Sequence, residues 1–377
     1  MTLRNAIIML LGELALAGCA SPPLVPFSTQ TTPLMLVPAV QRQAQDKRGR
    51  FREIFCAVLD ARKATLPDYR GCDDAITRVG EEPRGTGEPV ALGPARRKLT
   101  LLFVPGVGWD CFSNWLAAED TIGQYLRQFG YDMVTVDING LGSSAHNAAQ
   151  IRDAIANLPR GEASRDLVVV GYSKGAVDTL VALSDYPEIR DRVAAMISLA
   201  GAVGGSPLAN DSSDAQLNLL QHFPGATCKP AGGGALRDLK PETREAWLAA
   251  HPLPPGIAFY SVITFPTPER ISSILDGGYR KLARVDARND SQVIFYNQFI
   301  PDSALVAYLN ADHWAVAVPV ARTHGLVGTF VVDRNGYPRE ALFEALLRLV
   351  EEDLRGAGDR PSRARTGSEP LSASDGD

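Results

Sequence analysis

The sequence predicts an α/β fold in which helices flank a mostly parallel central sheet. Segments typical of strands alternate with segments typical of helices along most of the 377 residues, and this alternation indicates repeated strand–helix–strand units. Several strand segments are continuous apolar runs, as expected when helices cover both faces of the sheet. A glycine- and proline-rich stretch at 203–255 interrupts the alternation, so we expect an inserted cap or lid there.

The N-terminus has the parts of an export signal. Residues 1–19 read MTLRNAIIMLLGELALAGC, an arginine followed by an apolar run that is short for a membrane span. Residues 16–19 resemble the bacterial lipobox, which implies a signal peptide over 1–18 and lipidation of Cys19; ordinary cleavage or an uncleaved anchor are the alternatives. Because Ala20 rather than aspartate follows, the resemblance implies an outer-membrane lipoprotein that faces the periplasm.

The segment 19–48 is predicted to be an extended tether between this anchor and the folded domain. It carries prolines at positions 22, 23, 26, 33 and 38 and sustains neither helical nor strand periodicity. A polyproline-like chain spans about 3.1 Å per residue, so the tether would hold the domain several tens of ångströms from the lipid. An alternative interpretation of the apolar segment 34–40 is that it lies across the surface of the domain.

The remaining cysteines predict two disulfides, because an exported chain meets an oxidising compartment. They are Cys56, Cys72, Cys111 and Cys228, and four cysteines allow three pairings. We favour Cys56 with Cys72, which closes a short local loop and leaves Cys111 and Cys228 to tie the segment after the first core strand to the insertion. No spacing of cysteines or histidines indicates a metal site, and no cofactor is expected.

The charge of the chain argues against nucleic-acid binding. The formal net charge is −5, and no basic stripe is visible. The arginine-rich pieces at 48–52 and 360–365 are short, and we interpret both as solvated charge.

The elements of the expected domain, residues 49–355, follow from hydrophobic periodicity. Strands are predicted at 99–104, 133–138, 168–170, 193–199, 257–265 and 304–309, and amphipathic helices at 49–62, 113–129, near 148–158, after residue 173 to about 183, and at 339–355. The polar residues 356–377 are predicted to be a disordered tail.

The elbow around Ser173 is the strongest functional signal. A run of valines ends in the residues GYSKG and passes directly into a helix-compatible stretch, which is the setting of a nucleophile elbow. Glycines at 171 and 175 permit the strained turn, and the first amides of the following helix can hold an oxyanion. A tight turn with an inert serine is the alternative interpretation.

A serine nucleophile needs a base and a group that orients the base. Among five histidines, His313 alone stands directly after a late core strand, with a helix-compatible AVAV shortly beyond it; a helix-capping role is its structural alternative. The order Ser, acid, His limits the acid to the segment after the strand at 257–265. We predict Asp290 as this acid, with Asp286 as the main alternative. Asp276 is a weaker candidate because it is further from His313 and its surroundings are more typical of a helix.

Over residues 95–350 the chain resembles the α/β-hydrolases. The features that carry the resemblance are the elbow at Ser173, the turn at 105–108, the loop DINGLGSS and the Asp-His-Trp sequence. The resemblance implies Ser173 as nucleophile, His313 as general acid and base, Asp290 as its orienter, and the amides of Val107 and Lys174 as the oxyanion hole. At 105–106 this chain has Pro-Gly where the family more often has His-Gly. Asp137 matches a position that is commonly structural in the family, so it is not part of the expected catalytic set.

The resemblance implies a serine hydrolase acting on acyl esters or lipids, attached to the membrane through its N-terminal anchor. Two alternative functions are compatible with the same sequence. An inactive envelope binding or scaffold protein would keep the fold without the activity. An acyltransferase would use the same triad with an acceptor other than water.

Overall fold

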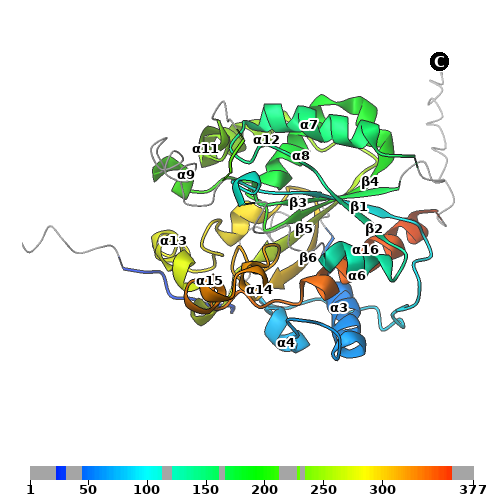
Figure 1. The fold of residues 1–377 in the computed structure, drawn as a ribbon, viewed down its shortest axis with the longest axis horizontal. Coiled ribbons are helices and arrows are strands. Elements are labelled where there is room, and N and C mark those ends of the chain that lie inside the picture. Colours follow the sequence, from blue (N-terminus) through cyan, green and yellow to red (C-terminus); the bar gives the residue numbers. More distant parts are fainter. Residues whose placement is uncertain are drawn as a thin grey trace, which may run out of the picture.

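A parallel sheet forms the centre of the molecule (Figure 1). The computed structural model describes residues 23–30, 45–112, 121–160, 166–211, 227–229 and 234–358. Six strands of this part pair in the order β2-β1-β3-β4-β5-β6, and every neighbouring pair is parallel. Their bounds are β1 Thr100–Val104, β2 Asp132–Thr135, β3 Leu167–Tyr172, β4 Val193–Leu199, β5 Ala258–Thr264 and β6 Ala304–Leu309. The predicted fold class is confirmed.

The order of the strands changes direction at β1. Strand β2 pairs with one side of β1, and the chain then crosses over so that β3 pairs with the other side. In open α/β sheets, ligands bind outside the carboxyl ends of the strands at such a switch point. The loops that follow β1 and β3 therefore occupy the expected position of a site.

The strands are apolar because helices cover both faces of the sheet. Every residue of β3, β4 and β6 is buried, whereas the edge strand β2 is mostly exposed. The expected strand at 133–138 ends early, at Thr135, because β1 ends at Val104 and the last bond to it is donated by the Val136 amide to the Phe103 carbonyl, at 2.8 Å.

The helices lie in two layers, one on each face (Figure 1). Apolar side chains of α3, α6 and α16 share one core cluster with the sheet, and those of α7 and α8 share another. The helices are α3 Arg48–Arg62, α4 Cys72–Ala75, α6 Thr121–Arg127, α7 Ser144–Asn157, α8 Lys174–Asp185, α9 Leu208–Asp211, α11 Ala235–Asp238, α12 Pro241–Ala250, α13 Asp276–Leu282, α14 Val320–Thr323, α15 Gly325–Phe330 and α16 Arg339–Gly358. Short 3-10 turns are η1 Asp110–Phe112, η2 Pro187–Arg192, η3 Pro268–Arg270, η4 Ser273–Leu275 and η5 Phe295–Gln298.

Several helix ends differ from the sequence-based expectation. Helix α7 begins before residue 148 because Ser143 caps it, accepting a bond from the His146 amide at 3.3 Å. Helix α16 continues past residue 355 to Gly358, while the rest of the expected tail lies outside the described residues. Helix α6 covers only the second half of the expected 113–129, and residues 113–120 lie outside the described part.

The N-terminal region is bound to the domain at several points, which corrects the expectation of a free tether over 19–48. In the segment 23–30, the Val25 amide donates to the Ala283 carbonyl at 2.8 Å. Residues 45–47 bond to Leu305 of β6 on both its amide and its carbonyl. Residues 1–22 and 31–44 lie outside the described part, and with them the predicted signal peptide, Cys19 and the apolar piece at 34–40.

Residues 74–77 continue the sheet beyond β6. Ile76 pairs antiparallel with Leu309, the Thr77 amide donates to Tyr308 at 2.7 Å, and the Asn310 amide donates to Ala75 at 3.0 Å. The disulfide between Cys56 and Cys72 joins α3 to α4 directly before this segment.

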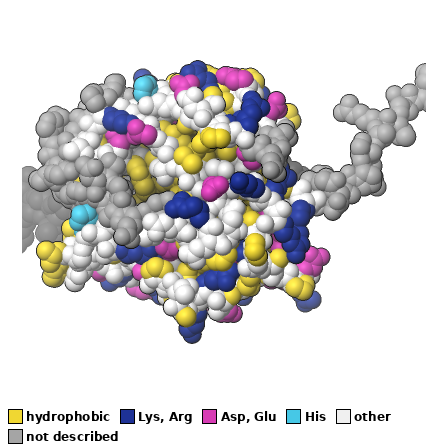
Figure 2. All heavy atoms as spheres, turned by 45° about the vertical axis from the view of Figure 1, so that its right-hand side comes forward, with side chains coloured by type: hydrophobic (Ala, Val, Ile, Leu, Met, Phe, Trp, Pro, Cys, Tyr) yellow, Lys and Arg dark blue, Asp and Glu magenta, His cyan; other side chains and the backbone are white. Residues whose placement is uncertain are grey.

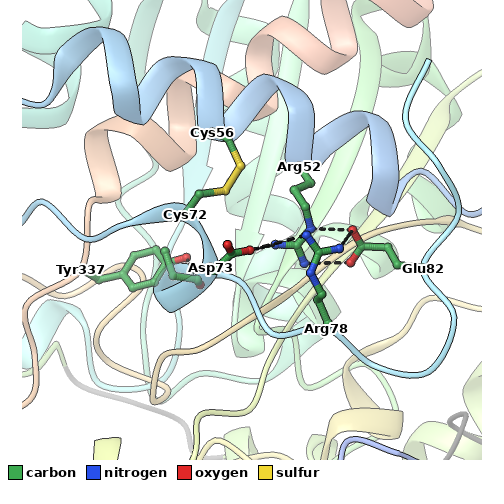
Figure 3. Close-up of a disulfide and its surroundings, with 8 residues drawn as sticks. Arg52, Cys56, Cys72, Asp73, Arg78, Glu82 and Tyr337 are labelled. Atoms are coloured by element: carbon green, nitrogen blue, oxygen red, sulfur yellow. Dashed lines mark hydrogen bonds and ion pairs between the residues drawn. A yellow bond between two sulfur atoms is a disulfide. The ribbon is translucent and has the colours of Figure 1, made fainter. Parts of the chain in front are cut away.

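Arginines at the start of α3 are buried, so the interpretation of the arginine-rich residues 48–52 as solvated charge is wrong in part. Arg48 and Arg52 are 3% and 7% exposed. Figure 3 shows Arg52 and Arg78 reaching the same carboxylate, Glu82, beside the disulfide. The Arg48 guanidinium binds Asp46 and the Val79 carbonyl. These ion pairs hold the loop at 79–82 on α3.

Part of the insertion 203–255 is described, namely 203–211, 227–229 and 234–255, with α9, α11 and α12. A disulfide joins its Cys228 to Cys111 in η1, so both predicted disulfides are present. On the face shown in Figure 2, acidic and basic side chains are interspersed. None of the helices in the described ranges has the length and hydrophobicity needed to cross a bilayer.

Candidate active site

Ser173 stands at the sharp turn between β3 and α8. Its backbone has φ 56° and ψ −124°, a conformation that is strained for a residue with a side chain. A Cβ atom on Gly171 would lie 2.5 Å from the Ala176 Cα, and one on Gly175 would lie 2.1 Å from the Val104 carbonyl oxygen. Glycine is required at both flanking positions, as the elbow pattern predicted.

The turn after β1 lies against the serine. A Cβ atom on Gly106 would come within 2.7 Å of the Ser173 Cβ and 3.2 Å of its Oγ. Val107 follows directly in this turn, and Lys174 is the first residue of α8, where amides have no partner within the helix. The turn that carries Val107 and the first residue of α8 therefore both adjoin Ser173, and the role of their two amides as an oxyanion hole stays a prediction.

His313 is brought to Ser173 by the turn after β6. Its Nε2 lies 2.8 Å from the Ser173 Oγ, and its Nδ1 lies 2.7 Å from the Asp290 Oδ2. The imidazole is 4% exposed. The residues after it form turns rather than the expected helix, and α14 begins only at Val320, so His313 does not cap a helix.

The Asp290 carboxylate is completely buried and accepts hydrogen bonds at both oxygens. Its Oδ1 accepts the amides of Gln292 at 3.0 Å and Val293 at 2.8 Å. Besides His313, its Oδ2 accepts from the Thr264 hydroxyl at 2.6 Å and the Gln298 amide at 3.2 Å. Five donors converge on this group and fix the position of the carboxylate.

The rival carboxylates are engaged elsewhere. Asp286 forms an ion pair with Arg288 at 2.7 Å, and Asp276 forms one with Arg280 at 2.7 Å. The structure brings Asp290, and neither of these two, into contact with His313.

Two residues support the histidine in ways that the sequence patterns did not predict. The Tyr172 hydroxyl donates to the His313 carbonyl at 2.8 Å, and burial holds the pKa of this phenol well above its usual value. Asp312 accepts the amides of Ser272 at 3.0 Å and Ala315 at 2.9 Å, and burial raises its pKa. Only contacts between distant segments reveal these roles.

Lys174 also takes part in an ion pair that was not anticipated. Its Nζ lies 2.6 and 2.8 Å from the two Asp178 oxygens, and both side chains are buried. The Asn147 amide of α7 donates to the same carboxylate at 2.7 Å. Burial raises the pKa of Asp178, while Lys174 and Asn147 act in the opposite direction. The pair fixes the first turn of α8 directly after the serine.

The insertion is fastened beside the turn after β1. The Asp110 carboxylate accepts the amides of Gly140 at 2.9 Å and Lys229 at 3.0 Å, and the Thr227 amide donates to Cys111 at 2.8 Å. Asp137, which we expected to be structural, forms an ion pair with Lys229 at 2.6 Å. Together with the disulfide, these bonds fix residues 227–229 near the switch point.

The other histidines of the described part lie elsewhere. His251 stacks on Trp247, with ring centroids 4.4 Å apart, and His146 is exposed on α7. His222 lies outside the described residues. Within the part that the structure describes, no three His, Cys, Asp or Glu side chains are grouped to hold a metal ion.

The chain is similar to solved esterase and lipase structures. The metagenomic carboxyl esterase MGS0156 is 39% identical and superposes with a TM-score of 0.77, over 91% of this chain and 99% of that one. The Staphylococcus hyicus lipase is 11% identical, with a TM-score of 0.51 over 72% of this chain and 100% of that one, and shares the fold. No family model and no curated protein matches the sequence. With its parallel sheet and its similarity to the carboxyl esterase over most of its length, the chain belongs to the α/β-hydrolase superfamily.

Proposed function

We propose that this protein hydrolyses carboxylic esters through an acyl-enzyme on Ser173. The observation that carries the proposal is the line of hydrogen bonds from the Ser173 hydroxyl through the His313 imidazole to the Asp290 carboxylate, at 2.8 and 2.7 Å. This is the arrangement of nucleophile, base and orienting acid that acyl transfer requires. The similarity to a carboxyl esterase supports the same class of substrate.

In the acylation step, the Ser173 oxygen attacks the carbonyl carbon of the ester while the His313 Nε2 takes the hydroxyl proton. The carbonyl oxygen becomes an oxyanion, which the amides of Val107 and Lys174 stabilise; one such donor contributes about 10²–10³ in rate. Collapse of this intermediate breaks the bond to the alcohol oxygen, and His313 returns the proton to the leaving alcohol. Asp290 holds the imidazole in the required tautomer and stabilises its charged form.

Deacylation repeats these steps with water as the nucleophile. His313 takes a proton from water as the water oxygen attacks the acyl carbon. The bond to the Ser173 oxygen then breaks, His313 returns the proton to that oxygen, and the carboxylic acid is released. An acceptor alcohol in place of water would make the reaction an acyl transfer with the same residues. An inactive binding protein would not need the converging donors on Asp290, which favours an enzyme over that alternative.

We also propose that the protein is a lipoprotein attached through Cys19 to the outer membrane, facing the periplasm. The lipobox-like residues 16–19 support an anchor. The two disulfides support an oxidising compartment. Acyl esters presented at a lipid surface are the substrates that this attachment favours.

Labelling with a fluorophosphonate probe tests the function. The probe should modify the parent protein and fail to modify Ser173→Ala, which should also lose ester turnover while keeping its thermal unfolding temperature. Ser184→Ala, at the other end of α8, is the matched control and should label like the parent. Undiminished labelling or turnover in Ser173→Ala would contradict the assignment.

A further inference from the structure

Exposed apolar side chains gather around α13, α15 and the N-terminal segment 23–30. Eight large hydrophobic side chains of the described residues are exposed, and six of them belong to this region. They are Leu24, Val25, Ile274, Val285, Leu326 and Phe330, which we call the α13–α15 face. Soluble proteins seldom expose such groups together without a binding role.

Backbone hydrogen bonds hold the parts of this face next to one another. The Val25 amide donates to the Ala283 carbonyl at 2.8 Å, directly after α13, and the Ile274 amide donates to the Val331 carbonyl at 3.0 Å, directly after α15. Figure 1 shows α13 and α15 at the same end of the molecule. Leu326 and Phe330 are four residues apart on α15, so they project from one side of it, and they are 81% and 73% exposed.

The same region adjoins the candidate active site. Beneath the face lies an apolar cluster formed by Ile271, Leu275, Tyr279, Ala283 and Ala287. Trp314, the residue after His313, packs against this cluster from one side, and Phe27 of the N-terminal segment packs against it as well. The apolar cluster of this region is therefore in contact with the residue next to the catalytic histidine.

The N-terminal segment connects this face to the predicted lipid. Cys19 precedes Pro23 by four residues, and an extended chain spans at most about 3.6 Å per residue, so a lipidated Cys19 lies within about 14 Å of Pro23. Leu24 and Val25 of the face follow immediately. The short covalent connection keeps this side of the domain close to the proposed lipid anchor.

The charges beside the face suit a bilayer with anionic headgroups. The stretch 276–285 carries three exposed basic side chains, Arg280, Lys281 and Arg284. Arg280 pairs with Asp276 at 2.7 Å, and Lys281 lies 3.9 Å from Asp211. Basic residues next to exposed apolar groups are typical of surfaces that lie at the boundary of headgroups and acyl chains.

We propose that the α13–α15 face docks on the bilayer that carries the lipid anchor, so that the mouth of the active site faces the membrane. This inference rests on the proposed anchor at Cys19, and it deepens the proposed function by making lipids of the same bilayer the accessible esters. Leu326, Phe330 and Val285 would enter the boundary of the acyl chains.

Fluorescence from single labelled positions tests the proposal independently of turnover. The full acylated chain carries either Leu326→Cys or Val134→Cys, each labelled with a polarity-sensitive dye, in vesicles of phosphatidylethanolamine and phosphatidylglycerol. The four other cysteines of the mature domain are paired in disulfides, so the added thiol alone reacts. Val134 is the matched control because it is exposed but lies on the edge strand β2.

The dye at position 326 should shift to the blue and be quenched by brominated acyl chains, while the dye at position 134 should do neither. Equal behaviour at the two positions overturns the proposal. A blue shift at 326 that depends on protein concentration without vesicles would assign the face to a second copy of the chain, and also overturns it. Protein that fails to float with vesicles refutes both the anchor and the docking.

A second measurement separates docking from catalysis. The double variant Leu326→Ser and Phe330→Ser should lower turnover of an ester held in vesicles about tenfold or more, because two large apolar groups no longer enter the bilayer. Turnover of a soluble short-chain ester should not change, and Val134→Ser should leave both activities intact. Loss of both activities would show that the face is structural. A parent protein without any esterase activity would refute the proposed function but not the fluorescence result.

Discussion

Replacement of Asp290 by asparagine tests the orientation of the catalytic histidine. In the parent protein both carboxylate oxygens accept hydrogen bonds: Oδ1 from the amides of residues 292 and 293, and Oδ2 from His313, Thr264 and Gln298. Asparagine keeps the shape of the side chain but replaces one acceptor oxygen with an NH₂ group, which can only donate. The NH₂ group of the new side chain must therefore point toward neighbours that themselves donate hydrogen bonds.

The two orientations of the new amide have different costs. With NH₂ at the Oδ1 position, two buried backbone amides lose their acceptor, at about 1–3 kcal/mol each. With NH₂ at the Oδ2 position, the Thr264 hydroxyl can rotate to accept, and the Gln298 amide keeps its bonds to the Thr264 and Val293 carbonyls, which makes this orientation the less costly one. The NH₂ then donates to the His313 Nδ1, so the ring proton moves to Nε2. An imidazole with its proton on Nε2 cannot take the proton of Ser173.

We therefore expect Asp290→Asn to lower kcat by about 10⁴, which corresponds to about 5.5 kcal/mol in activation free energy. Asp286→Asn is the matched control, since Asp286 pairs with Arg288 and does not touch His313. It should keep kcat within about threefold, as expected for the loss of a partly exposed ion pair. Purified proteins are compared with a soluble ester, and thermal unfolding confirms that both variants are folded at the assay temperature.

The opposite ranking would refute this reasoning. If Asp286→Asn were crippling and Asp290→Asn close to the parent, the orienting acid would lie four residues earlier in the chain. Large losses from both variants, with folding intact, would mean that the loop requires both carboxylates.

Three further predictions concern the anchor, the disulfides and pH. Cys19→Ser should leave a soluble or unprocessed protein, because no other group accepts the lipid, and unchanged partitioning into detergent would contradict this. Removal of the Cys111–Cys228 disulfide, which has a sequence separation of 117, should lower the unfolding free energy by about 5 kcal/mol, against about 3 kcal/mol for Cys56–Cys72 with its separation of 16; denaturant titration should not give the reverse order. Because burial raises the pKa of Asp312 above 3.8, the native state retains this proton as pH rises, and the unfolding free energy falls above pH 3.8 until the group ionises in the native state. The stability deficit of Asp312→Asn should therefore shrink as pH rises, and a growing deficit would refute the assignment.

Local sequence patterns were sufficient for the class of fold and for the elbow. The residues around Ser173 predict a strand, a sharp turn and a helix from local sequence alone, and the structure has the predicted turn there. The strands β4 and β6 have the predicted bounds. Polar residues flank β6 at 303 and 310, and β4 begins after Arg192 and ends before Ala200 and Gly201. Chain order and the position after a strand singled out His313 and Asp290, which the structure places in contact.

Contacts between distant segments were beyond the reach of these patterns. Thr264 and Gln298 surround Asp290, but neither belongs to a motif, and only folding brings them together. The docking of 23–30 was missed because prolines indicate an extended chain equally well when it lies on a surface. The burial of Arg48 and Arg52 was missed because their acceptors lie about thirty residues further along the chain, at 79–82.

The contact between residues 70–74 and the turn after β6 has a consequence for the time at which activity can appear. Asn310 lies three residues before His313, and it bonds to Asp74 across 236 residues and to Arg70 across 240. Contacts of such separation form late, because a long loop must close first. A chain still crossing a membrane from its N-terminus would expose Ser173 long before β6 and the His313 turn emerge. The nucleophile would have no base until β6 and the His313 turn join residues 70–74, so we expect hydrolysis to begin only after these two segments have met.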